Sequence, residues 1–228
     1  MAETWDGWLN DLNGFHVKPE HVFAAMETAK GGPVDEGGVG GGTGMICHEF
    51  KGGLGTASRV TSGGHTVGVL VQANYGLRRQ LTIAGVPVGK EISEGAFRPD
   101  EDGSIIVVIA TDAPVLPHQL KRLARRASLG LGRMGSISGD GSGDLFVAFS
   151  AANAVPTEPK KSGVVQLMNT EDLGPVFAGV VDATEEAIVK ALVAGETMTG
   201  RDGHVVRGLP HEPLRVVLKQ YGRLNEGP

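Results

Sequence analysis

The sequence predicts a mixed α/β protein, because segments with strand and helix patterns alternate along the chain. Strand-like runs rich in β-branched residues are grouped at 65–88, 104–111 and 144–150. Helix-like segments precede and follow them, at 19–30, from Pro117 onwards and at 171–194. This order favours two sheets, or one large mixed sheet, covered by helices. With 228 residues, the chain can bury a sizeable core as one large domain or two small ones.

Charge and cysteine content argue against several classes of protein. The net charge is −5 and the basic residues are spread along the chain, which disfavours nucleic acid as a partner. The single cysteine, Cys47, excludes an intrachain disulfide and fits a reducing compartment. No apolar run approaches the ~18 residues of a membrane helix, and the first residues do not resemble a signal peptide. We therefore expect a cytoplasmic protein without a membrane partner. The seven scattered histidines predict no metal site.

The individual elements follow from local patterns. A proline in the first turn predicts a helix over 19–30, which Gly31 ends. Alternating side chains predict a strand over 65–75 with a turn at Asn74, and residues 81–88 predict a second short strand. Pro117 opens a basic amphipathic helix. The remaining predictions are a strand at 144–150, a helix over 171–194 broken near Gly174, a loop at 199–207, and a terminal strand or short helix at 213–221.

Glycine is over-represented, with 36 residues concentrated in 31–64 and 130–143. The densest segment, 37–44, invites comparison with a phosphate-binding loop. It lacks the G-x-x-x-x-G-K-[ST] pattern, the dinucleotide spacing and a following helix. We interpret it as backbone crowding around a pocket.

Ser104, where the 104–111 strand begins, is a candidate nucleophile. Ser104 follows Gly103 in a turn, and most serines in such turns carry no chemistry. The alternative is that its hydroxyl attacks the unhindered Gly103 carbonyl, shifting the acyl group from nitrogen to oxygen, after which water hydrolyses the ester. The exposed Ser104 α-amine, with a reference pKa of about 7.7–8.0, would suit a general base at neutral pH.

Two other segments offer suitable partners for such a serine. The Asn74 side chain is able to donate to an oxyanion. Ser142 and Asp144 lie on one face of an extended chain, where the carboxylate would orient Ser142 and Ser142 would relay a proton to Ser104. Each segment also has a simpler interpretation, Asn74 as a turn residue and 142–144 as a loop.

Taken together, several blocks resemble the L-aminopeptidase/D-esterase–D-amidase family, which includes the β-peptidyl aminopeptidases. The blocks are ETWDGWLND at 3–11, HV at 16–17 with PEHV at 19–22, GGGTGM at 40–45, KGGLGTASR at 51–59, VGVLVQANYG at 67–76, residues 103–114, and GSGD at 141–144. They keep the family's order and cover most of residues 1–150.

The resemblance implies a four-layer α/β/β/α sandwich, incomplete here at the N-terminus and similar in layout to the N-terminal-nucleophile hydrolases. It implies one catalytic domain, 1–228, that cuts itself between Gly103 and Ser104 into an α-chain part, 1–103, and a β-chain part, 104–228. Similar proteins are free of cofactors and usually form homotetramers.

The resemblance also implies roles for individual residues. Ser104 would be the nucleophile, with Ser142 and Asp144 assisting it. Asn74 would serve the oxyanion hole. Glu3 and Trp5 would line the substrate pocket, where the Glu3 carboxylate would pair with the α-ammonium of a substrate.

Two features depart from the family pattern. Trp5 stands where family members carry tyrosine beside the nucleophile, and an indole has an N–H donor but no titratable hydroxyl. In the family a long segment precedes the block at 3–11, which here begins the chain.

The predicted function is an autoprocessing serine aminopeptidase or amidase that acts on small peptides, amides or esters through an acyl-enzyme on Ser104. Three alternatives stay open. The first is a non-catalytic, truncated relative that acts as a folded binding or assembly protein. The second is an acyltransferase of the ornithine acetyltransferase type, in which the nucleophile is typically threonine. The third, less favoured, is a nucleotide-binding protein.

Overall fold

The centre of the molecule is a four-stranded sheet in the order β3-β4-β5-β6. The structure is a computed structural model that describes residues 4–100, 103–153 and 162–224. Its long strands are β3 (Gly53–Val60), β4 (Thr66–Asn74), β5 (Ser104–Thr111) and β6 (Leu145–Ser150). β4 runs antiparallel to β3 and to β5, whereas β5 and β6 are parallel. The predicted strands at 65–75, 104–111 and 144–150 are therefore confirmed.

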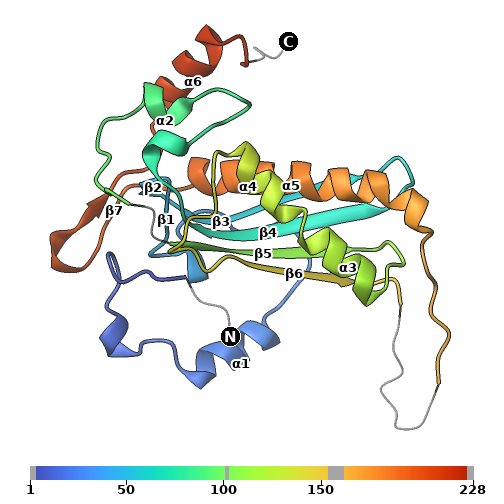
Figure 1. Cartoon of the computed structure of the whole chain (residues 1–228). Helices are drawn as coiled ribbons and strands as arrows, with labels where there is room; N and C mark the ends of the chain where they lie inside the picture. The colour runs from blue at the N-terminus through green and yellow to red at the C-terminus, as the bar shows by residue number, and fades with distance from the viewer. Residues whose placement is uncertain (1–3, 101–102, 154–161, 225–228) are drawn as a thin grey trace.

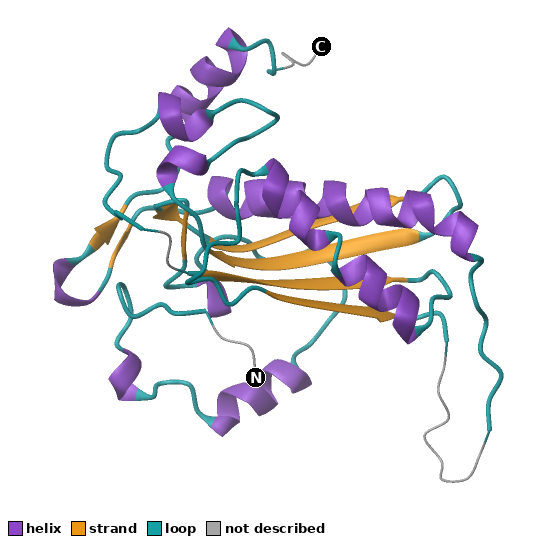
Figure 2. Cartoon of the chain, viewed as in Figure 1, coloured by secondary structure: helices purple, strands orange, loops and turns teal. Residues whose placement is uncertain are grey.

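One face of this sheet is covered by helices (Figures 1 and 2). They are α3 (Pro117–Ala124), α4 (Ala127–Arg133) and the long α5 (Leu173–Val193). Ile105, Val107 and Ile109 of β5 are fully buried beneath them. Gly55 of β3 allows α5 to approach closely, because a Cβ there would lie 1.9 Å from the Ala187 carbonyl oxygen. The buried side chains of the strands and of the helices therefore pack into one hydrophobic core.

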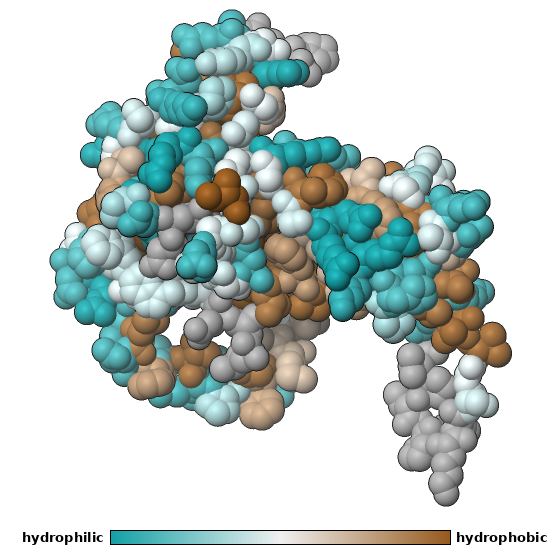
Figure 3. Space-filling view, viewed as in Figure 1, coloured by the Kyte–Doolittle hydropathy of each residue, from teal (hydrophilic) through white to brown (hydrophobic). Residues whose placement is uncertain are grey.

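The basic helix at Pro117 is confirmed, and its charges face outward. The surface over α3 is strongly hydrophilic in Figure 3. One basic side chain that follows this helix also contacts an aromatic ring. The Arg126 guanidinium lies 3.9 Å from the centre of the Phe177 ring on α5. This cation–π contact ties the connection between α3 and α4 to α5.

The opposite face of the sheet carries apolar side chains that remain accessible. Leu145, Val147 and Phe149 of β6 are 37%, 45% and 48% exposed. The described residues form one helical layer and one sheet layer, and no second sheet packs on this face among them. The mixed α/β class is confirmed, and these are two of the four layers of the predicted sandwich.

The remaining elements lie at the ends of the sheet or beyond it (Figure 1). They are α1 (Pro19–Glu27), β1 (Ile46–Cys47), β2 (Phe50–Lys51), α2 (Val88–Glu91), β7 (Met198–Thr199), β8 (Val205–Val206) and α6 (His211–Gln220). The N-terminal helix is confirmed, and the terminal segment is a helix. None of the helices described here is long and apolar enough to cross a membrane.

Three predictions of secondary structure are wrong. Residues 81–88 form no strand, because positive φ angles at Ala84 and Gly85 close a tight turn before α2. α5 is not broken near Gly174, since Pro175 lies in its first turn, where a helix needs no proline N–H. The predicted loop at 199–207 contains part of the β7–β8 hairpin.

Candidate active site

Three strand ends bring the predicted site residues to one edge of the sheet. Because β4 and β5 are antiparallel, the last residue of β4, Asn74, is paired with the first residue of β5, Ser104. Because β5 and β6 are parallel, β6 begins at the same edge, directly after Asp144. Residues separated by up to 70 positions in sequence thus meet through topology.

Gly103 has a backbone conformation that favours glycine. Its φ is +135°, and a Cβ added there would lie 2.1 Å from the Asn74 carbonyl oxygen. The half-buried Ser104 follows it at the start of β5. Its Oγ accepts a hydrogen bond of 2.9 Å from the backbone N–H of Gly143. The hydroxyl hydrogen of Ser104 is not used in this bond and is available to a base.

Asp144 collects three donors beside this serine. The Ser142 hydroxyl donates to Oδ1 in a short hydrogen bond. The Ile105 N–H donates to the same oxygen at 3.2 Å, and the Ser138 hydroxyl donates to Oδ2 at 3.1 Å. The contact with Ser104 itself comes from the N–H of the intervening Gly143. The 142–144 segment is thereby fixed against the start of β5.

The Asn74 side chain is buried, with 1% of the residue exposed, and is held from two sides. Its Oδ1 accepts from the Ile46 N–H at 2.8 Å, and its Nδ2 donates to the Trp5 carbonyl at 2.8 Å. The Trp5 backbone therefore lies next to the site, whereas Trp5 as a residue is 52% exposed. Glu3 lies outside the described residues.

A buried histidine supports the turn that follows Asn74. Burial lowers the pKa of His48 to about 4, so the ring is neutral at pH 7 and its Nδ1–H donates to the Leu77 carbonyl at 3.0 Å. The ring packs edge-on against Tyr75, with centroids 5.0 Å apart. A Cβ on Gly76 would lie only 2.6 Å from the ring. No local pattern around His48 signals this role.

The glycine-rich segment 37–44 is crowded, as the sequence predicts, but around a lysine. The Lys51 ammonium donates to the carbonyl oxygens of Gly42 and Gly52 at 3.0 and 2.8 Å. A Cβ on Gly42 would lie 2.4 Å from the Gly37 carbonyl oxygen. Burial lowers the pKa of Lys51 to about 8. Neither of the two cavities described below is lined by this segment, and the pocket expected there stays a prediction.

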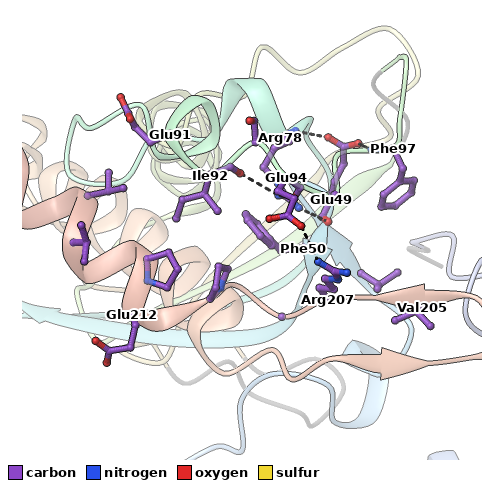
Figure 4. Close-up of a pocket in the computed structure, with 18 of the residues that line it drawn as sticks. Glu49, Phe50, Arg78, Glu91, Ile92, Glu94, Phe97, Val205, Arg207 and Glu212 are labelled. Atoms are coloured by element: carbon purple, nitrogen blue, oxygen red, sulfur yellow. Dashed lines mark hydrogen bonds and ion pairs between the residues drawn. The ribbon is translucent and has the colours of Figure 1, made fainter.

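Two cavities lie elsewhere in the described parts of the chain. One, of about 1400 Å³, lies between α6, β8 and the 92–97 segment (Figure 4). Another, of about 620 Å³, lies beside the start of α5. Neither is lined by Ser104, Asn74 or Asp144. The described residues contain no cluster of His, Cys, Asp and Glu suited to a metal ion.

These groups are the components of a serine hydrolase site. A serine hydroxyl directly follows a glycine of positive φ, and a backbone N–H donor and a hydroxyl–carboxylate pair lie beside it. The family model of Peptidase family S58 matches residues 1–206. The chain belongs to this family.

Individual relatives agree with this assignment. The chain is 53% identical over 244 aligned residues to the beta-peptidyl aminopeptidase BapA of Sphingosinicella microcystinivorans, covering 98% of this chain. Among solved structures it is similar to the L-aminopeptidase D-Ala-esterase/amidase of Ochrobactrum anthropi, described as a variant of the Ntn hydrolase fold (51% identity, 97% of this chain, TM-score 0.91). It is also similar to a beta-aminopeptidase of Burkholderia sp. (50% identity, 97% of this chain, TM-score 0.88). The chain spans 61%, 62% and 64% of the lengths of these relatives, respectively.

Proposed function

We propose that this chain carries the catalytic site of an autoprocessing serine aminopeptidase or amidase. The observation that carries the proposal is the Ser104 hydroxyl at the start of β5, behind a glycine with φ +135° and 2.9 Å from the Gly143 N–H. Membership of a peptidase family supports it, as do relatives named aminopeptidases. A serine at position 104, and the match to a peptidase family, favour hydrolysis over the acyltransferase alternative.

The first step is cleavage of the chain's own peptide bond. The Ser104 oxygen bonds to the Gly103 carbonyl carbon, the carbon–nitrogen bond breaks, and the nitrogen takes up the hydroxyl proton to become the free α-amine. Water then hydrolyses the ester, leaving a carboxylate on Gly103 and restoring the hydroxyl. The products are an α-chain, 1–103, and a β-chain, 104–228, of one catalytic domain.

The processed site then acts on a small peptide, amide or ester. The Ser104 hydroxyl attacks the substrate carbonyl, and its proton passes to the new α-amine or to the Ser142–Asp144 pair. Asn74 Nδ2 is the donor for the oxyanion: one of its hydrogens is engaged with the Trp5 carbonyl, which leaves the other for the substrate, while the Gly143 N–H is bonded to Ser104 Oγ. Glu3 and Trp5 would line the pocket for the substrate's α-ammonium. The reaction needs no cofactor.

The test is hydrolysis of three free-amine substrates: an L-amino acid amide, a D-amino acid ester and a β-amino acid p-nitroanilide. We expect the wild-type chain to hydrolyse at least one of them, and Ser104→Ala to hydrolyse none. The N-acetylated form of the same substrate is the control, because an aminopeptidase recognises the free amine. Equal hydrolysis of the acetylated form, or activity retained in Ser104→Ala, would refute the proposal.

The proposal extends to assembly as a homo-oligomer, a tetramer, in the cytoplasm. Assembly is what the family resemblance implies; the accessible apolar row on β6 lies on the face where the predicted sandwich places its second sheet. The single, buried Cys47 supports a reducing compartment. Light scattering of the purified chain tests the assembly, and a monomer at micromolar concentration would contradict it.

A further inference from the structure

The segment that leads to the Gly103–Ser104 bond is held by side chains from elsewhere in the fold (Figure 4). Residues 92–98 form neither helix nor strand. The Glu49 carboxylate accepts hydrogen bonds from the backbone N–H groups of Phe97 and Arg98, at 2.7 and 2.5 Å. Its second oxygen accepts from the Arg78 N–H at 2.7 Å. One carboxylate thus ties this segment to the turn after β4.

The Arg78 side chain holds the other end of the segment. Its guanidinium donates to the carbonyl oxygens of Ile92 and Glu94 at 3.1 and 2.9 Å. It stacks over the Phe50 ring, 3.2 Å from the centroid, and the residue is 2% exposed. Burial lowers the pKa of Arg78 to about 10, so it remains a cation at neutral pH. Glu49 and Arg78 together make four hydrogen bonds to the backbone of 92–98.

Glu49 is itself held in a strained conformation. His48 and Glu49 form the two-residue turn between β1 and β2, with φ of 48° and 61°. Turns with two positive φ angles favour Asn and Gly, and other residues remain there only where surrounding contacts fix them. Arg78 supplies such contacts by donating to the His48 and Glu49 carbonyls at 3.0 and 2.7 Å. The Glu49 carboxylate is therefore preorganised toward Phe97 and Arg98.

We propose that Glu49 is a positioning residue for self-cleavage, which anchors the chain upstream of the scissile bond. The inference rests on the proposed function, because it requires cleavage at Gly103–Ser104. Downstream, Ser104 is fixed by β5 and its pairing with Asn74. Upstream, the chain between Arg98 and Gly103 spans at most about 18 Å, so anchoring Arg98 restricts where the Gly103 carbonyl can lie. Fixing both sides restricts the backbone rotations open to Gly103, and with them the orientation of its carbonyl toward the Ser104 hydroxyl.

A purely structural role for Glu49 makes a different prediction, and the chain offers a matched control. Glu36 also accepts hydrogen bonds from a backbone N–H and a hydroxyl, both of Thr56, at 2.8 and 2.7 Å. Its partner lies on β3 and not on the segment before the scissile bond. Removing either carboxylate disturbs the fold, but only removal of Glu49 releases Phe97 and Arg98.

The experiment measures the first-order rate of self-cleavage by intact mass in the full chain, for wild type, Glu49→Ala, Glu49→Gln and Glu36→Ala. We expect cleavage to slow about 10²-fold in Glu49→Ala, the loss typical of a reacting group displaced by about 1 Å. Glu49→Gln keeps one oxygen and should fall between wild type and Glu49→Ala. Glu36→Ala should cleave at the wild-type rate. Once cleaved, Glu49→Ala should show wild-type kcat and KM for an amino acid amide, because Ser104 keeps its own contacts.

Hydrogen exchange in the uncleaved Ser104→Ala background gives a second readout. Adding Glu49→Ala should remove protection at the amides of Phe97 and Arg98, and adding Glu36→Ala should not. Wild-type cleavage rates in both Glu49 variants would overturn the inference and leave the proposed function standing. A wild-type chain that stays uncut, like Ser104→Ala, would instead overturn the proposed self-cleavage and the role of Glu49 with it.

Discussion

Replacing Gly103 by alanine tests whether the backbone at the scissile bond is as restricted as its geometry indicates. The added Cβ would lie 2.1 Å from the Asn74 carbonyl oxygen, so β4 and Gly103 must separate by about 1 Å or more. Non-glycine residues at unfavourable positive φ cost about 1–3 kcal/mol, which adds to the steric conflict. We expect Gly103→Ala to lose at least this much unfolding free energy and to cleave itself about 100-fold more slowly, since a 1 Å displacement at a reacting group costs that factor.

The assay is a time course of intact mass, with urea unfolding compared in the uncleaved Ser104→Ala background. Gly32→Ala is the matched control, because Gly32 has φ of +116° and no atom within 4 Å of an added Cβ. It should share the backbone strain but cleave at the wild-type rate. Cleavage of Gly103→Ala at the wild-type rate would refute the account of a restricted scissile carbonyl.

Three further predictions follow from buried titratable groups. In the folded chain His48 stays neutral until the pH falls to its pKa of about 4, whereas in the unfolded chain it binds a proton near pH 6.5. The unfolding free energy should therefore fall by about 3 kcal/mol as the pH is lowered from 6.5 to 4. Urea titrations of His48→Asn should lack this pH dependence, and asparagine tolerates the positive φ at this position. Lys51 releases its proton near pH 8 in the folded chain and near pH 10.5 in the unfolded chain. The unfolding free energy of wild type should therefore rise by about 3 kcal/mol between pH 8 and 10.5, and that of Lys51→Met should not. The same pH profile in both proteins would contradict this. Burial raises the pKa of Cys47 to about 12, and iodoacetamide at pH 7 should label it only after unfolding; labelling of the native chain, seen by mass, would exclude the buried environment.

The strands that the sequence predicted correctly are those whose pattern is local. β4 and β5 alternate buried and partly exposed side chains, and this alternation needs no knowledge of the rest of the fold. β3 was not predicted as a strand, because Gly53 and Gly55 interrupt its apolar pattern. Both glycines are required by tertiary neighbours: Cβ atoms there would collide with the Gly37 and Ala187 carbonyl groups. Such close approaches are invisible to a local pattern.

The candidate site divides in the same way. Ser104, Asn74 and the 142–144 segment were found from turn chemistry and family resemblance, and the strand pairing brings them to one edge. The Gly143 N–H was missed because a backbone donor has no residue type to recognise. Glu49 was missed because its carboxylate acts across 29 to 49 positions of sequence, on N–H groups of irregular backbone. Nothing in the residues beside it indicates those partners.

The most direct test of the central claim is the intact mass of the purified chain beside that of Ser104→Ala. The account predicts two species in wild type, corresponding to residues 1–103 and 104–228, and a single uncut chain in the variant. One uncut chain in both proteins would contradict self-cleavage by Ser104 and would favour a folded, non-catalytic relative. Two fragments in both would show that a different nucleophile cuts the chain.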